Sequence, residues 1–495
     1  MSRISRAIWK VAGVTAIFAA PVATVSPTSV FAASQPTKPI TLSVYLGPLA
    51  PTDSQVKSVA NPYPQGALYQ IAKNYEKLHP NVHIDVLPQV SMTGNNYTNR
   101  ENTWFASKTE PDIIWVQSEA ATIGPEGLLL PLNQYLKKKT PYDSSKSTWQ
   151  ASLLTQGPDR GPQGQEYEIP LNVVSTVFYY NKNILQEAGI HTLPKTLGQF
   201  FKDCALIKNA HISGVYPFYE TGNPTNWWFY GIYGSAIQGP LVKKSYWHGP
   251  KTGALNPEEM SRAVWTHRVT TNSPEIEQVW KWGKELVGYM PPWDPNMTNQ
   301  QANSLFVNGQ LAFYWDGNWD YNALKSAIGS QFKWGTMQLP IVTKSDYPTA
   351  KSIPLLGGPN NNVAITASAK RQHVVPWAVN FLQYLSSPSV DSVLNTQGAG
   401  GNIPNVKGAS VPSDESGFLR SVESSDSTGF FDFGIGPNIT APNVQGVLEA
   451  YLNGNLSLST TLRKAETLWV QEVQTQINQN QHGPKKERWN LKSWK

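Results

Sequence analysis

One long β-type run, residues 173–180, constrains the fold more than any other feature of this 495-residue sequence. Its best strand partner, residues 362–365, lies far downstream. The sequence between the two runs predicts helices of its own, at residues 183–188, 197–209, 227–236, 273–287 and 298–307. A strand pair that encloses so much regular structure requires the chain to leave one folded unit and return to it. The pattern therefore predicts two lobes between which the chain crosses more than once.

The N-terminal part of the chain alternates strands with helices. Residues 40–46 and 82–87 have strand patterns, and one face of the helix between them carries Leu68, Ile71, Ala72, Tyr75 and Leu78. A helix that joins two neighbouring strands makes them parallel. A helix at 95–108 and a buried strand at 112–116 follow. The last strong helix has an apolar stripe formed by Leu462, Ala465, Trp469, Val473 and Ile477. The alternation predicts an α/β protein.

The first 32 residues have the pattern of an export signal. Arg3, Arg6 and Lys10 precede an apolar stretch at 11–25 that is too short for a membrane span, and small residues follow it. We therefore expect the mature chain to begin at Ala33, in the periplasm or outside the cell and associated with the cell surface. No cysteine follows the apolar stretch, so we expect no lipid anchor.

The charge of the chain argues against nucleic-acid binding. The net charge is +6, but the signal contributes +3 and the tail at 485–495 contributes +4, which leaves about −1 for the body. We expect the basic tail to be a solvated end. Charged residues form only 15% of the chain, which is typical of an extracytoplasmic protein with a polar, uncharged surface. The only cysteine, Cys204, lies in an apolar helical run and is expected to be a buried small hydrophobe.

Sequence motifs of common enzymes are absent. The chain contains no GxxxxGK[ST], HExxH or GxSxG motif, and Pro80 interrupts any helix that would aim His79 and His83 at one metal ion. We therefore predict no cofactor and no metal site. A secreted glycoside-processing enzyme stays open, because its two carboxylates need not be close in sequence.

The segment FVNGQLAFYWDGNW, residues 306–319, combines a strand pattern with a turn. Leu311 opens an apolar β-type run, and a tight turn at Asp316 and Gly317 would then present Trp319. An aromatic face at such a position suits the C–H face of a sugar ring. The alternative is that these aromatic residues are core, although many of the 18 tryptophans lie among turn-forming residues.

Several motifs occur in a characteristic order. They are YEKLHPNV at 75–82, PDIIWVQ at 111–117, GLLLPLNQYL at 127–136, EIPLNVVSTVFYYNKNILQEAGI at 168–190, LPKTLGQF at 193–200, FVNGQLAFYWDGNW at 306–319, GGPNNNVAITASAK at 357–370 and YLNGNLSLSTTLRKAE at 451–466. Together they resemble the family 1 extracellular solute-binding proteins, the sugar-binding subunits of ABC importers. The resemblance covers nearly all of the mature chain.

The resemblance implies a two-lobed α/β fold of the type II periplasmic-binding-protein class, with a hinge and an interlobe ligand cleft. One lobe would hold residues 34–167 plus 358–406, and the other 168–357 plus 407–484. Hinge strands would lie at 168–172 and 357–362, where Gly357, Gly358 and Pro359 suit a bend.

The resemblance also implies candidate ligand-binding residues. Residues that follow the PDIIW strand line the cleft in the family, and here these are Trp115, Gln117 and Glu119. The tryptophan after the turn stacks on the sugar, which points to Trp319. Asp316 would accept hydrogen bonds from sugar hydroxyls, or would only form the turn.

Further candidates lie on the hinge and in loops. Asn172 and Asn360 belong to the hinge segments, and Val174 stands where maltose binders have a carboxylate, which argues against maltose. Trp227 and Trp228 could form a second stacking platform, with one of the two packed inward. The loop after the first strand adds Thr52 and Asp53.

These residues imply a monomeric protein that captures a sugar or oligosaccharide and delivers it to the permease subunits of an ABC transporter. Three alternatives remain: a binder of another solute, such as a polyol phosphate or peptide; an adhesin or sensor; and the glycoside-processing enzyme.

Overall fold

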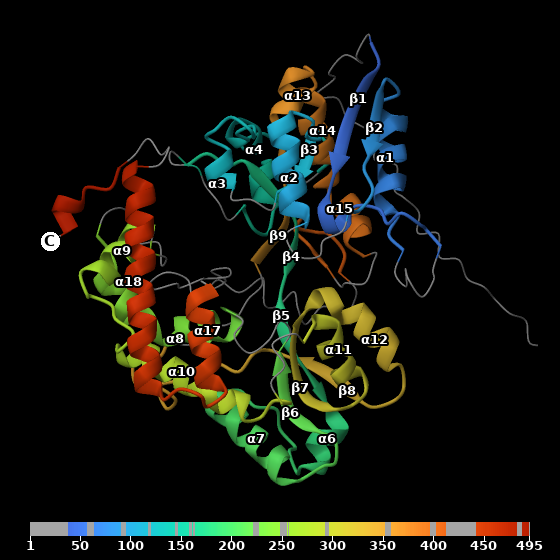
Figure 1. Ribbon diagram of the computed structural model, residues 1–495. Coiled ribbons are helices and arrows are strands. Elements are labelled where there is room, and N and C mark those ends of the chain that lie inside the picture. Colours follow the sequence, from blue (N-terminus) through green and yellow to red (C-terminus); the bar gives the residue numbers. More distant parts are fainter. Residues whose placement is uncertain are drawn as a thin grey trace, which may run out of the picture.

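The computed structural model places two β-sheets, each covered by helices, in two lobes (Figure 1). It describes residues 38–56, 64–90, 96–116, 120–143, 147–157, 161, 164–220, 227–247, 255, 257–292, 297–351, 358–396, 402–411, 442–482 and 488–494. The predicted export signal, residues 1–32, lies outside this part of the chain. No helix in the described ranges is both long enough and apolar enough to cross a membrane.

The first lobe is built on a six-stranded sheet with the order β10-β4-β9-β3-β1-β2. Its strands are β1 (Ile40–Tyr45), β2 (Val82–Val86), β3 (Ile113–Trp115), β4 (Glu168–Val174), β9 (Gly358–Ile365) and β10 (Ile403–Pro404). Strand β1 is parallel to β2 and β3, whereas β9 is antiparallel to β3 and β4. The parallel β1–β2 pair confirms the unit predicted for residues 40–87.

Short and medium helices cover this sheet. They are η1 (Gly47–Leu49), α1 (Ala67–Leu78), α2 (Asn96–Ser107), α3 (Ala120–Ile123), α4 (Asn133–Leu136), α5 (Trp149–Ser152), α13 (Ala367–Arg371), α14 (Val375–Leu385) and α15 (Pro388–Asn395). Four of the five apolar residues predicted on the inner face of α1 are buried. Leu78 is the exception at 44% exposed, because it is the last residue of the helix and the buried stripe ends one turn earlier, at Tyr75.

The second lobe is built on a four-stranded sheet with the order β6-β7-β5-β8. Its strands are β5 (Thr176–Asn181), β6 (Tyr216–Glu220), β7 (Leu311–Gly317) and β8 (Trp334–Met337). Strand β5 is antiparallel to β7 and β8, and β6 is parallel to β7. The tight turn predicted at Asp316–Gly317 is absent, because β7 continues through Gly317, which pairs with Thr176, and η2 (Asn318–Asp320) follows.

Helices from two separate parts of the chain cover the second sheet. They are α6 (Lys182–Glu187), α7 (Leu197–Asn209), α8 (Trp227–Ser245), α9 (Pro257–Trp265), α10 (Pro274–Val287), α11 (Asn299–Val307), α12 (Tyr321–Ile328), α17 (Pro442–Leu452), α18 (Leu458–His482) and η3 (Leu491–Trp494). Helices α7 and α11 each begin at a Thr-x-x-Gln capping box, formed by Thr196 and by Thr298. The five residues predicted as the stripe of α18 are all buried.

The chain first crosses between the lobes at Ser175. The N–H of Ser175 donates to Asn318 Oδ1, and the N–H of Asn318 donates to the Ser175 carbonyl, both at 2.9 Å. The predicted run 173–180 is therefore divided between the two sheets. Strand β4 pairs with β9 as far as Val174–Gly358, so residues 168–174 extend the first sheet, whereas the bounds implied by the family resemblance place them in the second lobe.

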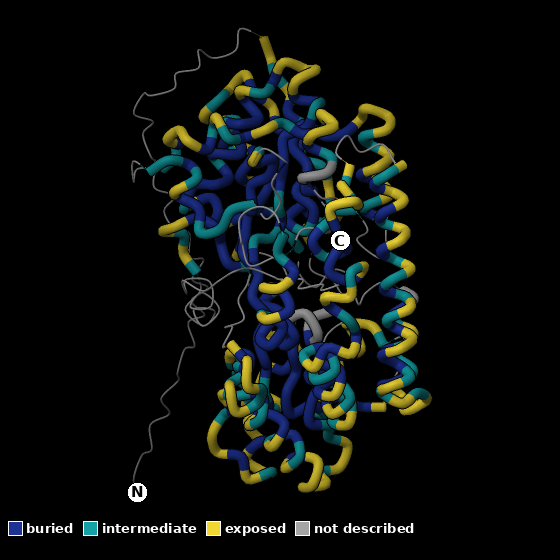
Figure 2. The backbone as a smooth tube through the Cα atoms, turned by 90° about the vertical axis from the view of Figure 1, so that its left-hand side faces the viewer, coloured by how far each residue is buried: buried dark blue, intermediate teal, exposed yellow. Residues whose placement is uncertain are grey.

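Each lobe has its own hydrophobic core (Figure 2). The first core includes Tyr45, Tyr75 and Trp149, and the second includes Trp280 and Trp469, all without exposed surface or nearly so. Cys204 is fully buried in the second core, as the sequence predicts.

The end of the chain packs on the second lobe. Trp494 is 2% exposed, its Nε1 donates to Glu258 Oε1 at 3.1 Å, and its ring lies 5.6 Å from that of Trp489. The prediction of a solvated tail is therefore wrong for residues 488–494, because two tryptophans bury apolar area against the helices of this lobe.

Candidate functional site

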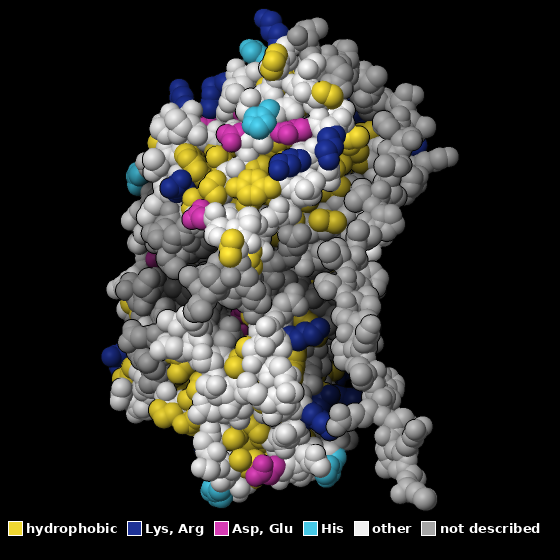
Figure 3. All heavy atoms as spheres, turned by 90° about the vertical axis from the view of Figure 1, so that its right-hand side faces the viewer, with side chains coloured by type: hydrophobic (Ala, Val, Ile, Leu, Met, Phe, Trp, Pro, Cys, Tyr) yellow, Lys and Arg dark blue, Asp and Glu magenta, His cyan; other side chains and the backbone are white. Residues whose placement is uncertain are grey.

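Strands of both sheets end at the level where the lobes meet. Strand β5 begins at the Ser175 crossing, so its antiparallel neighbour β7 and the parallel β6 both end there. In the first sheet, β1 and β3 end on the side of the second lobe (Figure 1). Figure 3 shows the two lobes above and below this level. In open α/β sheets, ligands bind outside the carboxyl ends of the strands, so this is the place to search for a site.

Glu220, the last residue of β6, is the most unusual group at these strand ends. It is 0% exposed, and neither carboxyl oxygen has a hydrogen-bond partner in the described part of the structure. Burial raises the pKa of Glu220 well above its ordinary value. A buried acid without a partner costs stability, which makes Glu220 a functional candidate.

Tyr233, on α8, lies on the same side of the second sheet as Glu220. Its hydroxyl is buried and also lacks a described partner, and its pKa is raised by burial and then by the nearby Glu220. The Tyr233 ring is 5.9 Å from Trp315, the residue that pairs with Glu220 in the β6–β7 ladder. Glu220 and Tyr233 therefore form one buried polar pair beside an indole ring.

Asp316 lies on the opposite face of the sheet, because strand side chains alternate and Trp315 precedes it. It is fully buried and its Oδ1 accepts from the N–H of Gly317 at 2.7 Å. Burial, followed by the neighbouring Asp320 carboxyl, raises the pKa of Asp316. Glu220 and Asp316 therefore project from opposite faces of the second sheet.

Trp319 follows β7 in η2 and is half-buried against the second core. A Cβ atom on Gly317 would lie 2.2 Å from the Trp319 ring, so the ring is seated directly on the Gly317 backbone. The absence of a side chain at Gly317 is what allows this position.

Asparagine side chains line the paired hinge strands β4 and β9. Asn172 is fully buried, with its Nδ2 donating to Asn395 Oδ1 at 3.1 Å, and it pairs in the ladder with Asn360. Asn361 is buried with a left-handed φ of 46°, a conformation that asparagine tolerates better than most residues. The Oδ1 atoms of Asn172, Asn361 and Asn362 have no described partner.

Buried hydrogen bonds hold the Asn172 side chain to the first lobe through Asn395. Asn395 also donates to the Leu171 carbonyl at 2.9 Å and to Asp391 Oδ1 at 2.8 Å, while Asp391 Oδ2 accepts from the N–H of Val406 at 3.1 Å. This buried chain of hydrogen bonds fixes the Asn172 amide in one orientation.

Trp115 ends β3 on the first-lobe side. It is 8% exposed, a Cβ atom on Gly47 would lie 2.4 Å from its ring, and the Tyr97 ring lies 4.6 Å away. The hydroxyl of Tyr97 donates to the Trp115 carbonyl. The Trp115 ring is therefore packed against Gly47 and Tyr97 and almost fully buried.

The remaining candidates are less informative. Asp53 is exposed in the loop after η1. Gln117 and Glu119 lie outside the described residues. Trp227 and Trp228 open α8, and the structure does not describe their side chains.

Several of the buried polar atoms without described partners lie near the strand ends. They include the oxygens of Glu220 and Tyr233, Oδ1 of Asn172, Asn361 and Asn362, Ser175 Oγ and Thr176 Oγ1. Leaving a buried donor or acceptor unsatisfied costs about 1–3 kcal/mol. Sequence patterns could not reveal this property, because it depends on what surrounds each atom. A ligand rich in both donors and acceptors would satisfy such a set.

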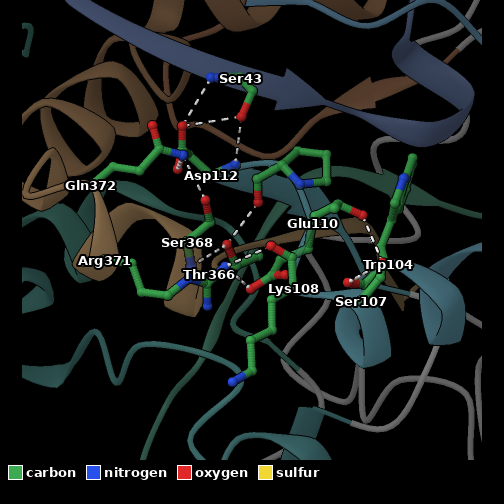
Figure 4. A network of polar contacts seen from close by, with 12 residues as sticks. Ser43, Trp104, Ser107, Lys108, Glu110, Asp112, Thr366, Ser368, Arg371 and Gln372 are labelled. Atoms are coloured by element: carbon green, nitrogen blue, oxygen red, sulfur yellow. Dashed lines mark hydrogen bonds and ion pairs between the residues drawn. The ribbon is translucent and has the colours of Figure 1, made fainter.

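A second polar cluster, at the other end of β3, has a structural role (Figure 4). Asp112 Oδ2 accepts from the N–H and hydroxyl of Ser43, both at 3.0 Å, and Asp112 Oδ1 accepts from Gln372 at 3.2 Å. Arg371 donates to Glu110 at 2.8 Å. These bonds tie β3 to β1 and to the end of α13.

No group of three potential metal-ligating side chains occurs in the described part of the chain. His79 Nε2 is 2.9 Å from the Tyr142 hydroxyl, whereas His83 Nδ1 is 2.8 Å from Glu76 Oε1. The two histidines thus contact different residues. His79 is partly buried against the Tyr75 ring, 4.5 Å away.

Comparison with known proteins assigns the family. The model of the bacterial extracellular solute-binding proteins matches residues 61–391. The chain belongs to this family. The diacetylchitobiose-binding protein DasA of Streptomyces coelicolor is 25% identical over 316 residues, which are 63% of this chain. The match spans 64% of the length of DasA.

Solved structures share the fold of this solute-binding protein. The sugar-binding protein MalE of Xanthomonas citri matches with a TM-score of 0.59 and 17% identity, over 88% of this chain and 98% of MalE. The GacH receptor of Streptomyces glaucescens, solved without ligand and with acarbose, matches with a TM-score of 0.59 and 18% identity, over 88% and 99% of the two chains. The predicted two-lobed fold is confirmed.

Proposed function

We propose that this solute-binding protein captures a sugar or oligosaccharide between its lobes, outside the cytoplasm, and delivers it to the permease subunits of an ABC transporter. One observation carries the proposal: several buried polar atoms without described partners lie where the strands of the two lobes end, and Trp319 lies in η2 directly after β7. The printed names of the relatives, which include a diacetylchitobiose binder and a sugar binder, support the same ligand class.

The chemistry of a sugar suits this set of groups. Each hydroxyl both donates and accepts, so it can satisfy the amide oxygens of Asn361 and Asn362 and the carboxyl of Glu220. The C–H faces of the ring suit Trp319. Asp316 lies on the face of the sheet opposite to that of Glu220, so it would contact the sugar at the end of the sheet. We assign no turnover to the protein, and no cofactor.

Ligand binding would favour a closed arrangement of the lobes. Closure would pivot about the Ser175–Asn318 crossing and the β4–β9 pair, where Asn361 already has a left-handed backbone. A ligand that contacts both lobes binds the closed state better and so shifts the population toward it. We propose that the permease recognises this closed monomer.

A thermal-shift screen of the mature chain from Ala33 tests the proposal. Mono-, di- and oligosaccharides, including diacetylchitobiose and maltose, are compared with polyol phosphates and peptides. A ligand that binds only the folded state raises Tm by mass action, so a sugar series should raise Tm in a concentration-dependent manner. A cooperatively folded sample that responds to no sugar would refute the proposal. Incubation of the responding sugar with the protein should leave it intact.

A further inference from the structure

The hinge-facing end of the second sheet carries acids without compensating bases. Glu220 ends β6, Asp316 lies near the end of β7, and Asp320 ends η2. No lysine or arginine forms an ion pair with any of the three within the described ranges. This end of the second lobe therefore offers carboxyl groups that take part in no described ion pair with a lysine or arginine.

Aromatic rings cluster on the side of the second sheet that carries Glu220, whose ladder partner is Trp315. The Tyr233 ring lies 5.9 Å from Trp315 and 5.0 Å from Phe229. Aromatic faces attract cations, and a dry aromatic environment strengthens any ion pair formed within it. The surroundings thus favour a cation and disfavour an anion beside Glu220.

Glu220 and Tyr233 together have as many unsatisfied acceptor atoms as a primary ammonium group has N–H donors. Glu220 offers two carboxyl oxygens and Tyr233 offers its hydroxyl oxygen, and none of the three has a described partner. A primary ammonium has three N–H donors, whereas a hydroxyl has one and an N-acetylated amine has one. Only the ammonium can supply a donor to each acceptor and a charge opposite to that of the carboxylate.

We propose that the second-lobe end of the site selects an amino sugar, whose protonated amine binds the Glu220 carboxylate and the Tyr233 hydroxyl. The proposal rests on the proposed sugar-binding function and narrows its ligand class. On binding, the protonated Glu220 releases its proton to solvent and the ligand ammonium takes its place, so charge and protons balance.

Three β-1,4-linked disaccharides that differ only at C2 test the proposal by titration calorimetry at pH 6. They are cellobiose, with a hydroxyl, the glucosamine disaccharide, with an ammonium, and diacetylchitobiose, with an acetamide. The glucosamine disaccharide should bind at least tenfold more tightly than the other two. Equal or weaker binding of the glucosamine disaccharide would overturn the inference while leaving sugar binding intact. If none of the three binds, the inference falls together with the proposed function.

Variants identify the residue responsible. Glu220→Gln should reduce the preference for the amine over the hydroxyl and the acetamide to less than twofold, and Tyr233→Phe should reduce that preference partly. Asp203→Asn removes another partly buried carboxyl of the same lobe, on α7, and should keep the wild-type preference. A Glu220→Gln protein with the full preference would refute the assignment.

A second measurement needs no variant. Calorimetry in two buffers of different ionisation enthalpy counts the protons exchanged on binding. Because burial raises the pKa of Glu220, the glucosamine disaccharide should release more protons per site than cellobiose. Equal proton exchange for both sugars would contradict an ammonium–Glu220 contact even if the variants failed to fold.

Discussion

Ser175 and Asn318 bind each other at the point where the chain passes from the first lobe to the second. Two hydrogen bonds of 2.9 Å join them, one to the Asn318 side chain and one from its backbone. Asn318 also begins η2, which carries Trp319. The crossing and the proposed stacking residue are therefore coupled through one short segment.

Asn318→Ala should destabilise the protein by about 1–3 kcal/mol, because the buried N–H of Ser175 loses its acceptor. Urea unfolding of the mature chain measures this difference. Asn308→Ala, an exposed asparagine after α11, serves as the control and should be near neutral. If the two variants were equally stable, the hydrogen bond between Ser175 and the Asn318 side chain would not contribute to stability.

Trp319→Ala should weaken sugar binding by about 1–3 kcal/mol if the ring stacks on the ligand. Calorimetry with the sugar found in the thermal-shift screen measures this loss. The matched control is Trp265→Ala, a tryptophan on α9 that is 41% exposed and remote from the strand ends. Normal folding with unchanged affinity would exclude Trp319 from the site.

Gly317→Ala should lower sugar affinity without changing any group that contacts the sugar. The new methyl group would meet the Trp319 ring at 2.2 Å and displace it. Gly446→Ala on α17, where an added methyl meets open space, is the control. Binding curves of both variants measure their sugar affinity. Wild-type affinity of Gly317→Ala would show that sugar binding does not depend on the position of the Trp319 ring.

Glu220 should make the protein less stable as the pH rises. In the unfolded chain Glu220 ionises near its ordinary pKa of 4.5, but burial raises its pKa in the folded protein, so the folded state binds more protons above that pH. The free energy of unfolding therefore falls as pH increases from about 4.5.

Urea unfolding at several pH values between about 4 and 8 measures this slope. Glu220→Gln should reduce it, whereas Glu187→Gln, an exposed position on α6, should leave it as in the wild type. An identical slope in wild type and Glu220→Gln would mean that Glu220 is ionised in the folded protein.

Local patterns predicted much of the fold. The β1–α1–β2 unit, the strand β7 and the stripe of α18 follow from periodicity within a few turns of chain. The division of β4 from β5 does not, because Ser175 is held by Asn318, a residue 143 positions away. The packing of Trp494 on Glu258 is equally long-range.

A sequence motif marks one part of the candidate site, and only burial marks the other. The DGNW segment pointed to Trp319 and Asp316, which the structure places at the end of β7. Glu220 was missed, although an acid that ends an apolar strand just before a Gly-Asn-Pro loop is a signal that could have found it. Tyr233 carries no such signal, since only the fold brings its hydroxyl to Glu220.

A crystal structure of the mature chain with the sugar of largest thermal shift tests the central claim most directly. The account predicts the sugar between the lobes, with a ring against Trp319 and hydrogen bonds to Glu220 or to the asparagines of β9. A sugar bound elsewhere would contradict it. One such place is the 370 Å³ pocket on the second lobe that is lined by Phe201, Trp282 and Tyr289.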